Sequence, residues 1–221
     1  MSKNVVITGA NRGIGLAMCK HFQAQGDRVY ALCRRSSAEL AALGVKIIEN
    51  IDVASDVGIA NMVCALEHLD IDTLVCNAGI LRDESLSHLE LDTIREQFEV
   101  NALAPLRVVA SLRKQLKQGG KVALITSRMG SISDNGSGGR YGYRMSKAAL
   151  NAAGMSLSHD LASQNIAVGI YHPGYVQTEM VNYGGDISAS DSAEKLLGLI
   201  NNLTMADSGV FKHSNGCVLP W

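Results

Sequence analysis

Short apolar segments alternate along the chain with longer stretches in which apolar residues recur every three or four positions. The short segments predict buried strands at residues 4–8, 28–33, 45–49, 72–76, 121–126, 165–171 and 209–212. The longer stretches predict helices at residues 14–25, 36–43, 55–68, 90–117, 142–163 and 190–203. Because strands joined through helices run parallel, this alternation predicts an α/β fold: a doubly wound, mostly parallel seven-stranded sheet with helices on both faces.

The chain shows neither an internal repeat nor a linker, so residues 1–221 are expected to form a single domain. One segment of low complexity, residues 130–139, is rich in glycine and serine and lies between a predicted strand and a predicted helix. Two interpretations remain open for it, a solvated loop and a loop that contacts substrate.

Composition narrows the classes of function. The net charge of −1 gives no broad basic surface for nucleic acid or for an anionic membrane, so neither is expected as a partner. No apolar stretch approaches the ~20 residues that a membrane span needs, and no cationic and apolar leader precedes the first strand. The five cysteines are scattered, which is typical of reduced thiols, and we expect a cytoplasmic protein without a metal site.

A glycine-rich turn follows the first strand. Asn4–Thr8 leads directly into Gly9-Ala10-Asn11-Arg12-Gly13-Ile14-Gly15, and an amphipathic helix begins there. Glycines allow close backbone approach, and the free N–H groups at a helix start attract an anion, so this arrangement predicts the phosphate site of a single-domain Rossmann fold. The alternative is a turn that only allows the helix to pack closely on the strand.

Tyr143 and Lys147 are four residues apart near the start of a predicted helix and therefore share one face. A phenol has an ordinary pKa of about 10, and a nearby ammonium is expected to lower that pKa towards the working range of a general acid. Tyr141 has Met145 rather than a cation four residues later, so it is a poorer candidate for the acid.

With these features in place, the whole chain resembles the short-chain dehydrogenase/reductase family. The resemblance is carried, in chain order, by Thr8-Gly9-x3-Gly13-x-Gly15, Asn77-Ala78-Gly79, Asn101, Ser127, Tyr143-x3-Lys147 and Pro173-Gly174. Within the family, the segments Ser127-Arg128-Met129-Gly130-Ser131-Ile132 and Gly216-x2-Leu219-Pro220-Trp221 resemble the small C-factor-like and sniffer-like carbonyl reductases.

The resemblance implies catalytic roles for four residues. Tyr143 would be the general acid, Lys147 would shift its pKa and bind the nicotinamide ribose, and Ser127 would polarise the carbonyl oxygen. Asn101 would support a water-mediated proton path to Lys147, although an asparagine here could instead satisfy backbone groups at a local kink. Ser127 could likewise be only a turn residue at a strand end.

Charge at the end of the second strand bears on the cofactor. NAD enzymes place an acidic residue there to hold the ribose hydroxyls, but Cys33 occupies that position and Arg34 and Arg35 follow. Guanidinium groups suit a 2′-phosphate, so we predict NADP(H), with Arg34 and Arg12 as the main phosphate ligands and Arg35 as either a third ligand or a surface charge.

The resemblance implies further contacts to the cofactor. They are Gly9, Asn11, Gly13, Ile14 and Gly15 in the glycine turn, Asp52 and Val53 at the adenine, Asn77, Ala78 and Gly79 at its ribose, Tyr143 and Lys147, and Pro173, Gly174, Val176 and Thr178 at the nicotinamide. Asp52 could alternatively cap the next helix, although Ser55 is the better cap. His172 is more typical of a structural histidine at a strand end than of a catalytic one.

Together these features predict an NADPH-dependent enzyme that reduces an aldehyde or ketone to an alcohol. The alternative is a nucleotide-binding regulatory or cell-signalling protein of the C-factor kind. The expected partner is a small carbonyl or alcohol substrate. Small residues on the helix at 142–163 could pack in a homodimer or a homotetramer, or could pack only against the sheet of the same chain, so the oligomeric state stays open.

Overall fold

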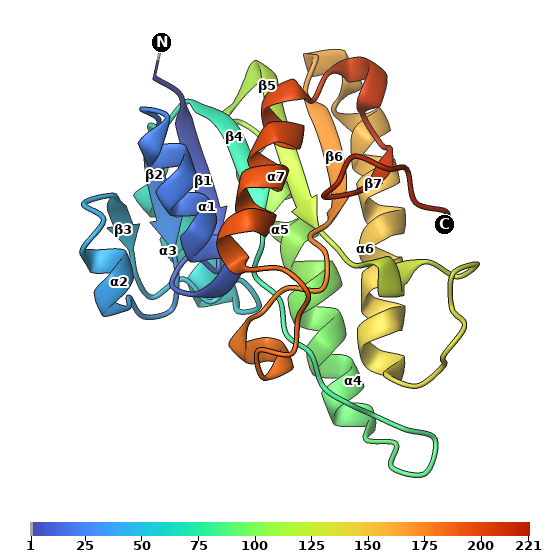
Figure 1. Ribbon diagram of the computed structural model, residues 1–221. Helices are drawn as coiled ribbons and strands as arrows, with labels where there is room; N and C mark the ends of the chain where they lie inside the picture. The colour runs from blue at the N-terminus through green and yellow to red at the C-terminus, as the bar shows by residue number, and fades with distance from the viewer. Residues whose placement is uncertain (1) are drawn as a thin grey trace.

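The computed structural model describes residues 2–221 and contains one seven-stranded sheet with helices on both faces (Figure 1). Its strands are β1 Asn4–Thr8, β2 Arg28–Leu32, β3 Lys46–Ile48, β4 Ile71–Cys76, β5 Leu116–Ile125, β6 Ala167–His172 and β7 Phe211–His213. Every neighbouring pair is parallel, in the spatial order β3-β2-β1-β4-β5-β6-β7. The predicted Rossmann architecture is confirmed.

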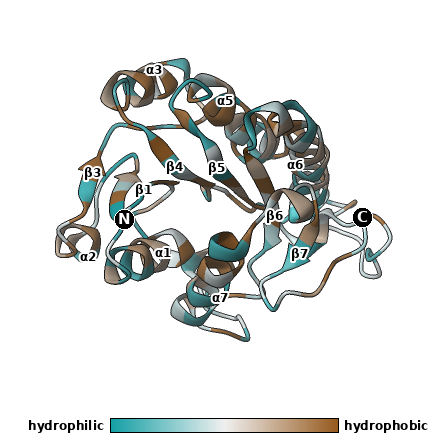
Figure 2. Ribbon diagram, turned by 90° about the horizontal axis from the view of Figure 1, so that it is seen from above, coloured by the Kyte–Doolittle hydropathy of each residue, from teal (hydrophilic) through white to brown (hydrophobic). Residues whose placement is uncertain are grey.

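Two apolar layers hold the helices on the sheet (Figure 2). On one face lie α1 Gly13–Ala24, α2 Ala38–Ala41 and α7 Ala189–Asn202; on the other lie α3 Asp56–Ala65, α5 Ala104–Ser111 and α6 Tyr141–Asp160. Met18 and Phe22 of α1 pack with Leu196 of α7 in one buried cluster. Leu150 of α6 belongs to the cluster on the opposite face. Both faces of the sheet are covered, which explains why its strands are continuous apolar runs rather than alternating ones.

The order of the strands reverses at β1. The chain passes from β1 to β2 and β3 on one side, and then returns to place β4 on the other side of β1. A crevice forms at such a reversal, outside the carboxyl ends of the strands, and ligands of doubly wound proteins bind there. The glycine turn after β1 and the segment after β4 both lie at this point.

The predicted helix at 90–117 is wrong in its interior and at its end. The structure has α4 Leu91–Phe98, a π-helical turn at Glu99–Leu103, and α5, which ends at Ser111. Pro105 has no N–H to donate to the carbonyl four residues earlier, and a π-turn accommodates this defect.

β5 begins at Leu116, five residues before the predicted start at 121. Its register against β4 shifts between the Ile71–Leu116 pair and the Thr73–Lys121 pair. Gly119 within this irregular stretch has a φ of 76°. The glycines obscured the strand because they interrupt its apolar pattern. The other predicted boundaries agree with the structure within three residues.

Candidate active site

Tyr143 and Lys147 lie on the first two turns of α6, as their spacing predicts. The Lys147 Nζ is 5.8 Å from the centre of the Tyr143 ring. Lys147 is only 4% exposed, and its Nζ donates a hydrogen bond of 2.9 Å to the carbonyl oxygen of Ile125 at the end of β5. The ammonium is therefore held between the sheet and the tyrosine.

Ser127 follows β5 and is buried beside the same tyrosine. Its Oγ accepts a hydrogen bond from the backbone N–H of Met129 at 3.1 Å and so caps the short 3₁₀ turn at Arg128–Gly130. Ser127 is therefore a turn residue, which was one of its two predicted roles. Because its Oγ only accepts in this turn, its hydroxyl proton is free to be donated. A Cβ at Gly130 would come within 2.7 Å of the Lys147 carbonyl carbon, so the turn packs directly on α6.

The pKa of Tyr143 differs from the expectation. Burial raises it, and the Ser127 hydroxyl and the Arg140 charge only partly oppose that rise. Burial also lowers the pKa of Lys147 to about 8. The expectation that Lys147 lowers the Tyr143 pKa therefore needs correction, because desolvation of the phenol has the largest effect and the groups that oppose it are Ser127 and Arg140.

Asn101 lies in the π-turn and is fully buried. Its Oδ1 accepts from the N–H of Ile80 at 2.9 Å, and its Nδ2 donates to the carbonyl of Ile80 at 2.9 Å and to Ser146 Oγ at 3.0 Å. The side chain thus satisfies backbone groups beside a kink. A Cβ at Gly79 would stand 3.2 Å from Asn101 Oδ1 and 3.6 Å from Lys147 Nζ, so both groups face the same small space.

The glycine turn forms a close backbone cradle at the start of α1. Gly9 and Gly13 have φ angles of 65° and 54°, which glycine adopts without strain. A Cβ at Gly15 would lie 2.2 Å from the carbonyl oxygen of Gly9. The first turn of α1 has neither a side-chain cap nor an acidic residue, so its N–H groups remain available to an anion. The cradle fits a pyrophosphate.

The segment Asn77–Gly79, after β4, lies against the glycine turn. Asn77 Nδ2 donates to the carbonyl oxygens of Thr8 and Gly9, both at 3.1 Å. The hydroxyl of Thr8 accepts from the N–H groups of Asn77 and Ala78, at 3.1 and 3.2 Å. The glycine turn and the end of β4 are therefore locked together.

Two arginines follow β2, and a carboxylate near them is Glu49, which comes after β3 and accepts from the N–H of Ser36 at 2.6 Å. Cys33 is buried, whereas Arg34 and Arg35 are exposed. Asn11 Nδ2 donates to the carbonyl of Arg35 at 3.0 Å, which joins this loop to the glycine turn. Arg12 of the glycine turn is paired with Glu179, which follows Thr178.

Asp52 and Val53 follow β3. The Asp52 carboxylate accepts from the N–H of Ala54 at 3.0 Å, while Ser55 caps α3 through the N–H of Gly58, also at 3.0 Å. Ser55 is therefore the helix cap, as the sequence suggests. The second oxygen of Asp52 has no partner among residues 2–221 and can accept from an amine.

The segment after β6 lies against the glycine turn. A Cβ at Gly13 would meet the Thr178 methyl group at 3.3 Å. Gly174 has a φ of 96°, and Val176 is buried and bridges to Ile187. The carbonyl of Pro173 accepts from Ser192 Oγ at 2.7 Å, which anchors this wall on α7.

His172 packs edge-on against His213, with their ring centres 4.8 Å apart. Burial is the main cause that lowers the pKa of His172 to about 3, and the His213 and Arg128 charges add to it. The imidazole is therefore neutral at and around neutral pH.

Replacing His172 by glutamine is expected to leave the shape of the pH–rate profile unchanged between pH 5 and 9, because a group already neutral there cannot supply a titrating limb. Steady-state rates across that range check this. Loss of a limb with a midpoint in the range would show that His172 takes part in proton transfer.

One buried charged group near the site escaped the sequence analysis. Glu84, in the loop after β4, is 4% exposed and bonds to the N–H of Gly142 at the start of α6. No periodicity or spacing marks a single glutamate in a loop, and its contact lies 58 residues away in sequence.

Within residues 2–221, no group of three or more histidine, cysteine, aspartate or glutamate side chains is arranged to hold a metal ion. None of the helices in the same range combines the length and the apolar character that crossing a bilayer requires.

Comparison with known proteins agrees with this geometry. The family model for short chain dehydrogenases matches residues 3–186. A 1-hydroxy-2-glutathionyl-2-methyl-3-butene dehydrogenase from Rhodococcus sp. (strain AD45) is 36% identical, with 98% of this chain and 99% of that protein covered. The C-signal protein of Myxococcus xanthus is 40% identical over 68% of this chain and 93% of its own length.

The fold also matches solved structures over its full length. The NADPH-bound carbonyl reductase from chicken fatty liver superposes with a TM-score of 0.90 at 29% identity, covering 100% of this chain and 99% of that one. The chain therefore belongs to the short-chain dehydrogenase/reductase family, whose members are oxidoreductases that use nicotinamide cofactors.

Proposed function

We propose that the protein is an NADPH-dependent reductase that converts an aldehyde or ketone to an alcohol. The observation that carries the proposal is the meeting of Ser127, Tyr143 and Lys147 at the carboxyl end of β5, beside an uncapped glycine cradle. When bound, the reduced nicotinamide supplies the hydride that the carbonyl carbon accepts.

Tyr143 donates its phenolic proton to the carbonyl oxygen as that oxygen gains negative charge. Ser127 donates a hydrogen bond to the same oxygen, and its own position is fixed by the N–H of Met129. Because burial raises its pKa, the phenol is protonated at neutral pH and has a proton to give, although the higher pKa makes it a weaker donor.

Lys147 holds the ribose of the cofactor and returns a proton to Tyr143 after each turnover. Asn101 and Gly79 border the space in front of the ammonium, which makes room for a water-mediated path to solvent. In this proposal Asn101 has two roles, since its amide also keeps the π-turn in place.

The proposed cofactor contacts follow the walls of the crevice. Gly9, Gly13 and Gly15 with Asn11 and Ile14 would surround the pyrophosphate, and Arg12, Arg34 and Arg35 would bind the 2′-phosphate. Asp52 and Val53 would hold the adenine, Asn77, Ala78 and Gly79 the adjoining ribose, and Pro173, Gly174, Val176 and Thr178 the nicotinamide. Arg12 would have to exchange Glu179 for the phosphate.

Arg34→Glu is expected to weaken NADPH binding by about 10- to 100-fold, the usual worth of one charge-assisted hydrogen bond, while NADH binding stays unchanged or improves. Fluorescence titration of each cofactor measures the two affinities. Arg28→Glu is the matched control, because Arg28 stands exposed at the opposite end of the same strand. An equal loss for NADH and NADPH would contradict the assignment of Arg34 to the 2′-phosphate.

The activity is tested by following NADPH consumption with a panel of aldehydes, ketones, diketones and quinones. The reverse reaction is followed with NADP⁺ and a panel of alcohols that includes glutathione conjugates, in view of the likeness to the Rhodococcus dehydrogenase. Turnover of at least one carbonyl is expected. Cofactor binding without turnover of any compound would argue against the reductase.

A second function is a nucleotide-binding regulatory or cell-signalling protein. The likeness to the C-signal protein favours it. The two functions differ in one respect that is simple to measure. A regulatory protein keeps its effect in cells when Tyr143 is replaced, whereas an enzyme loses its effect together with its turnover.

We further propose that residues 1–221 act as one domain in the cytoplasm, alone or as a homodimer or homotetramer. All five cysteines are free in the structure, in keeping with a reducing compartment. Sedimentation of the purified protein measures the oligomeric state directly.

A further inference from the structure

A buried carboxylate lies next to the first turn of the helix that carries Tyr143. Glu84 belongs to the loop between β4 and α4 and is 4% exposed. None of the ion pairs formed by residues 2–221 includes it. Removing a carboxylate from water without a cation is costly, so neutral donors must compensate it.

Three donors converge on this carboxylate. Oε1 accepts from Thr93 Oγ1 at 2.6 Å and from Gln97 Nε2 at 2.5 Å, both on α4. Oε2 accepts from the backbone N–H of Gly142 at 3.2 Å. A charged acceptor strengthens each of these bonds, and the positive end of the α6 dipole favours the charge.

The start of α6 has no cap of its own. Arg140 is the N-cap residue, with a φ of 50° and no side-chain hydrogen bond, and the first turn holds no acidic residue. Gly142 is the second residue of the helix and Tyr143 the third. Glu84 therefore provides from a distant loop the acceptor that serine or aspartate usually provides locally.

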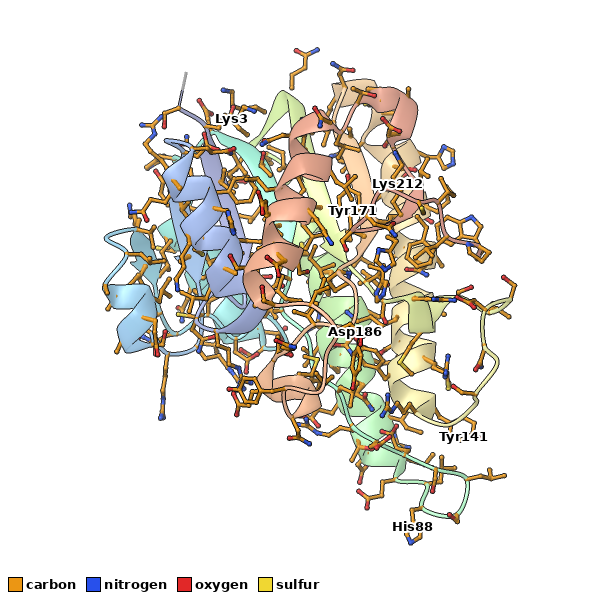
Figure 3. All side chains as sticks on the ribbon, viewed as in Figure 1. Lys3, His88, Tyr141, Tyr171, Asp186 and Lys212 are labelled. Atoms are coloured by element: carbon orange, nitrogen blue, oxygen red, sulfur yellow. The ribbon has the colours of Figure 1, made fainter. Side chains whose placement is uncertain are left out.

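The loop that carries Glu84 contacts the start of α6 at two more points. The carbonyl of Glu84 accepts from the N–H of Arg140 at 2.8 Å, and Asp83 pairs with the Arg140 guanidinium at 3.0 Å. A Cβ at Gly142 would come within 2.4 Å of Gln97 Nε2, so the helix start rests directly on α4. Figure 3 shows Tyr141 on this first turn, at the same end of the molecule as His88 of the loop.

We propose that Glu84 is a positioning residue for Tyr143. Its carboxylate fixes the first turn of α6, and so it sets the direction of the phenol towards Ser127 and the carbonyl oxygen. This inference rests on the proposed reductase function. It assigns to the loop after β4 a role in aligning proton transfer rather than in binding the cofactor.

The carboxylate is required because an amide cannot satisfy the same neighbours. In Glu84→Gln only one oxygen remains for the donors of Thr93, Gln97 and Gly142, and the new NH₂ must face one of those donors. The Gly142 bond is then lost or lengthened. Misplacement of a reacting group by about 1 Å costs on the order of 100-fold in rate.

The test compares Glu84→Gln with Thr93→Val. The valine variant removes the Thr93 hydrogen bond to Glu84 Oε1 but leaves the bond from the Gly142 N–H to Oε2 intact. It therefore lowers the stability of the folded protein, as Glu84→Gln does, while Glu84 still caps the start of α6. We expect Glu84→Gln to lower kcat by about 10-fold or more and to raise the solvent isotope effect on kcat, with the Kd for NADPH unchanged. Thr93→Val should keep kcat within about twofold of the wild type.

A kcat in Glu84→Gln close to that of the wild type would overturn the proposal. So would equal losses of kcat in the two variants, which would indicate general destabilisation. If the wild type reduces no carbonyl, the reductase function fails by itself. The proposal is then judged by the Tyr143 ring resonance of ¹³C-tyrosine-labelled protein, assigned with Tyr143→Phe. Glu84→Gln should shift that resonance and Thr93→Val should not, and an unmoved resonance would overturn the proposal.

Discussion

Tyr143→Phe is expected to lower the kcat of carbonyl reduction by about 1000-fold, while the Kd for NADPH changes by less than about twofold. Phenylalanine keeps the ring in its place but removes the only proton that the side chain can donate. The carbonyl oxygen would then have to take its proton from water, with Ser127 still polarising it. Stopped-flow measurement of NADPH oxidation gives both constants.

Tyr141→Phe is the matched control, since it removes the same hydroxyl two residues earlier on the same helix. Tyr141 is followed four residues later by Met145 rather than by a cation, so its variant should retain the wild-type kcat. Equal losses in the two variants would indicate a general effect on the start of α6. Full activity in Tyr143→Phe would exclude this phenol as the acid.

The arrangement of the strands and the glycine turn could be predicted because each rests on a local pattern. Asn4–Thr8 has an apolar centre, Val5 to Ile7, and is followed by the glycine turn, and the structure begins and ends β1 at the predicted residues. The prediction of one helix at 90–117 was wrong because no local pattern marks the places where its hydrogen bonding changes. Its apolar periodicity continues through a π-turn and past Ser111, and a continuous pattern does not reveal where hydrogen bonding changes.

The site shows a similar division. Spacing brought Tyr143 and Lys147 to one face of a helix, because helical geometry is the same in every protein. The pKa of Tyr143 could not be predicted in this way, because it depends on how much water the fold excludes from the phenol. Glu84 was missed because its effect arises from three donors that are distant in sequence or carried by another element.

Lys147→Met is expected to lower kcat by about 100-fold and yet to raise the stability of the cofactor-free protein. Burial lowers the pKa of Lys147 from 10.5 to about 8, so the folded state opposes its charge. The lowered pKa corresponds to a cost of roughly 3 kcal/mol at neutral pH. The variant also loses the hydrogen bond to the Ile125 carbonyl, which costs about 1 kcal/mol of stability. The net increase in the free energy of unfolding is then about 2 kcal/mol, which raises the Tm by about 5 °C.

The gain should depend on pH in a defined direction. The unfolded lysine titrates near 10.5 and the folded one near 8, so between these values the unfolded state binds more protons and wild-type stability increases with pH. Lys147→Met lacks this group, so its higher stability relative to the wild type is fully present below pH 8 and shrinks as the pH rises towards 10.

Denaturant unfolding at pH 6, 7, 8 and 9.5 measures the difference in stability, with Lys20→Met, at an exposed site on α1, as the control. A difference in stability that stayed constant over this range would show that the fold does not depress the Lys147 pKa. The lysine would then be tolerated at no cost, whereas the proposed mechanism requires a buried ammonium whose cost is offset only when the cofactor binds.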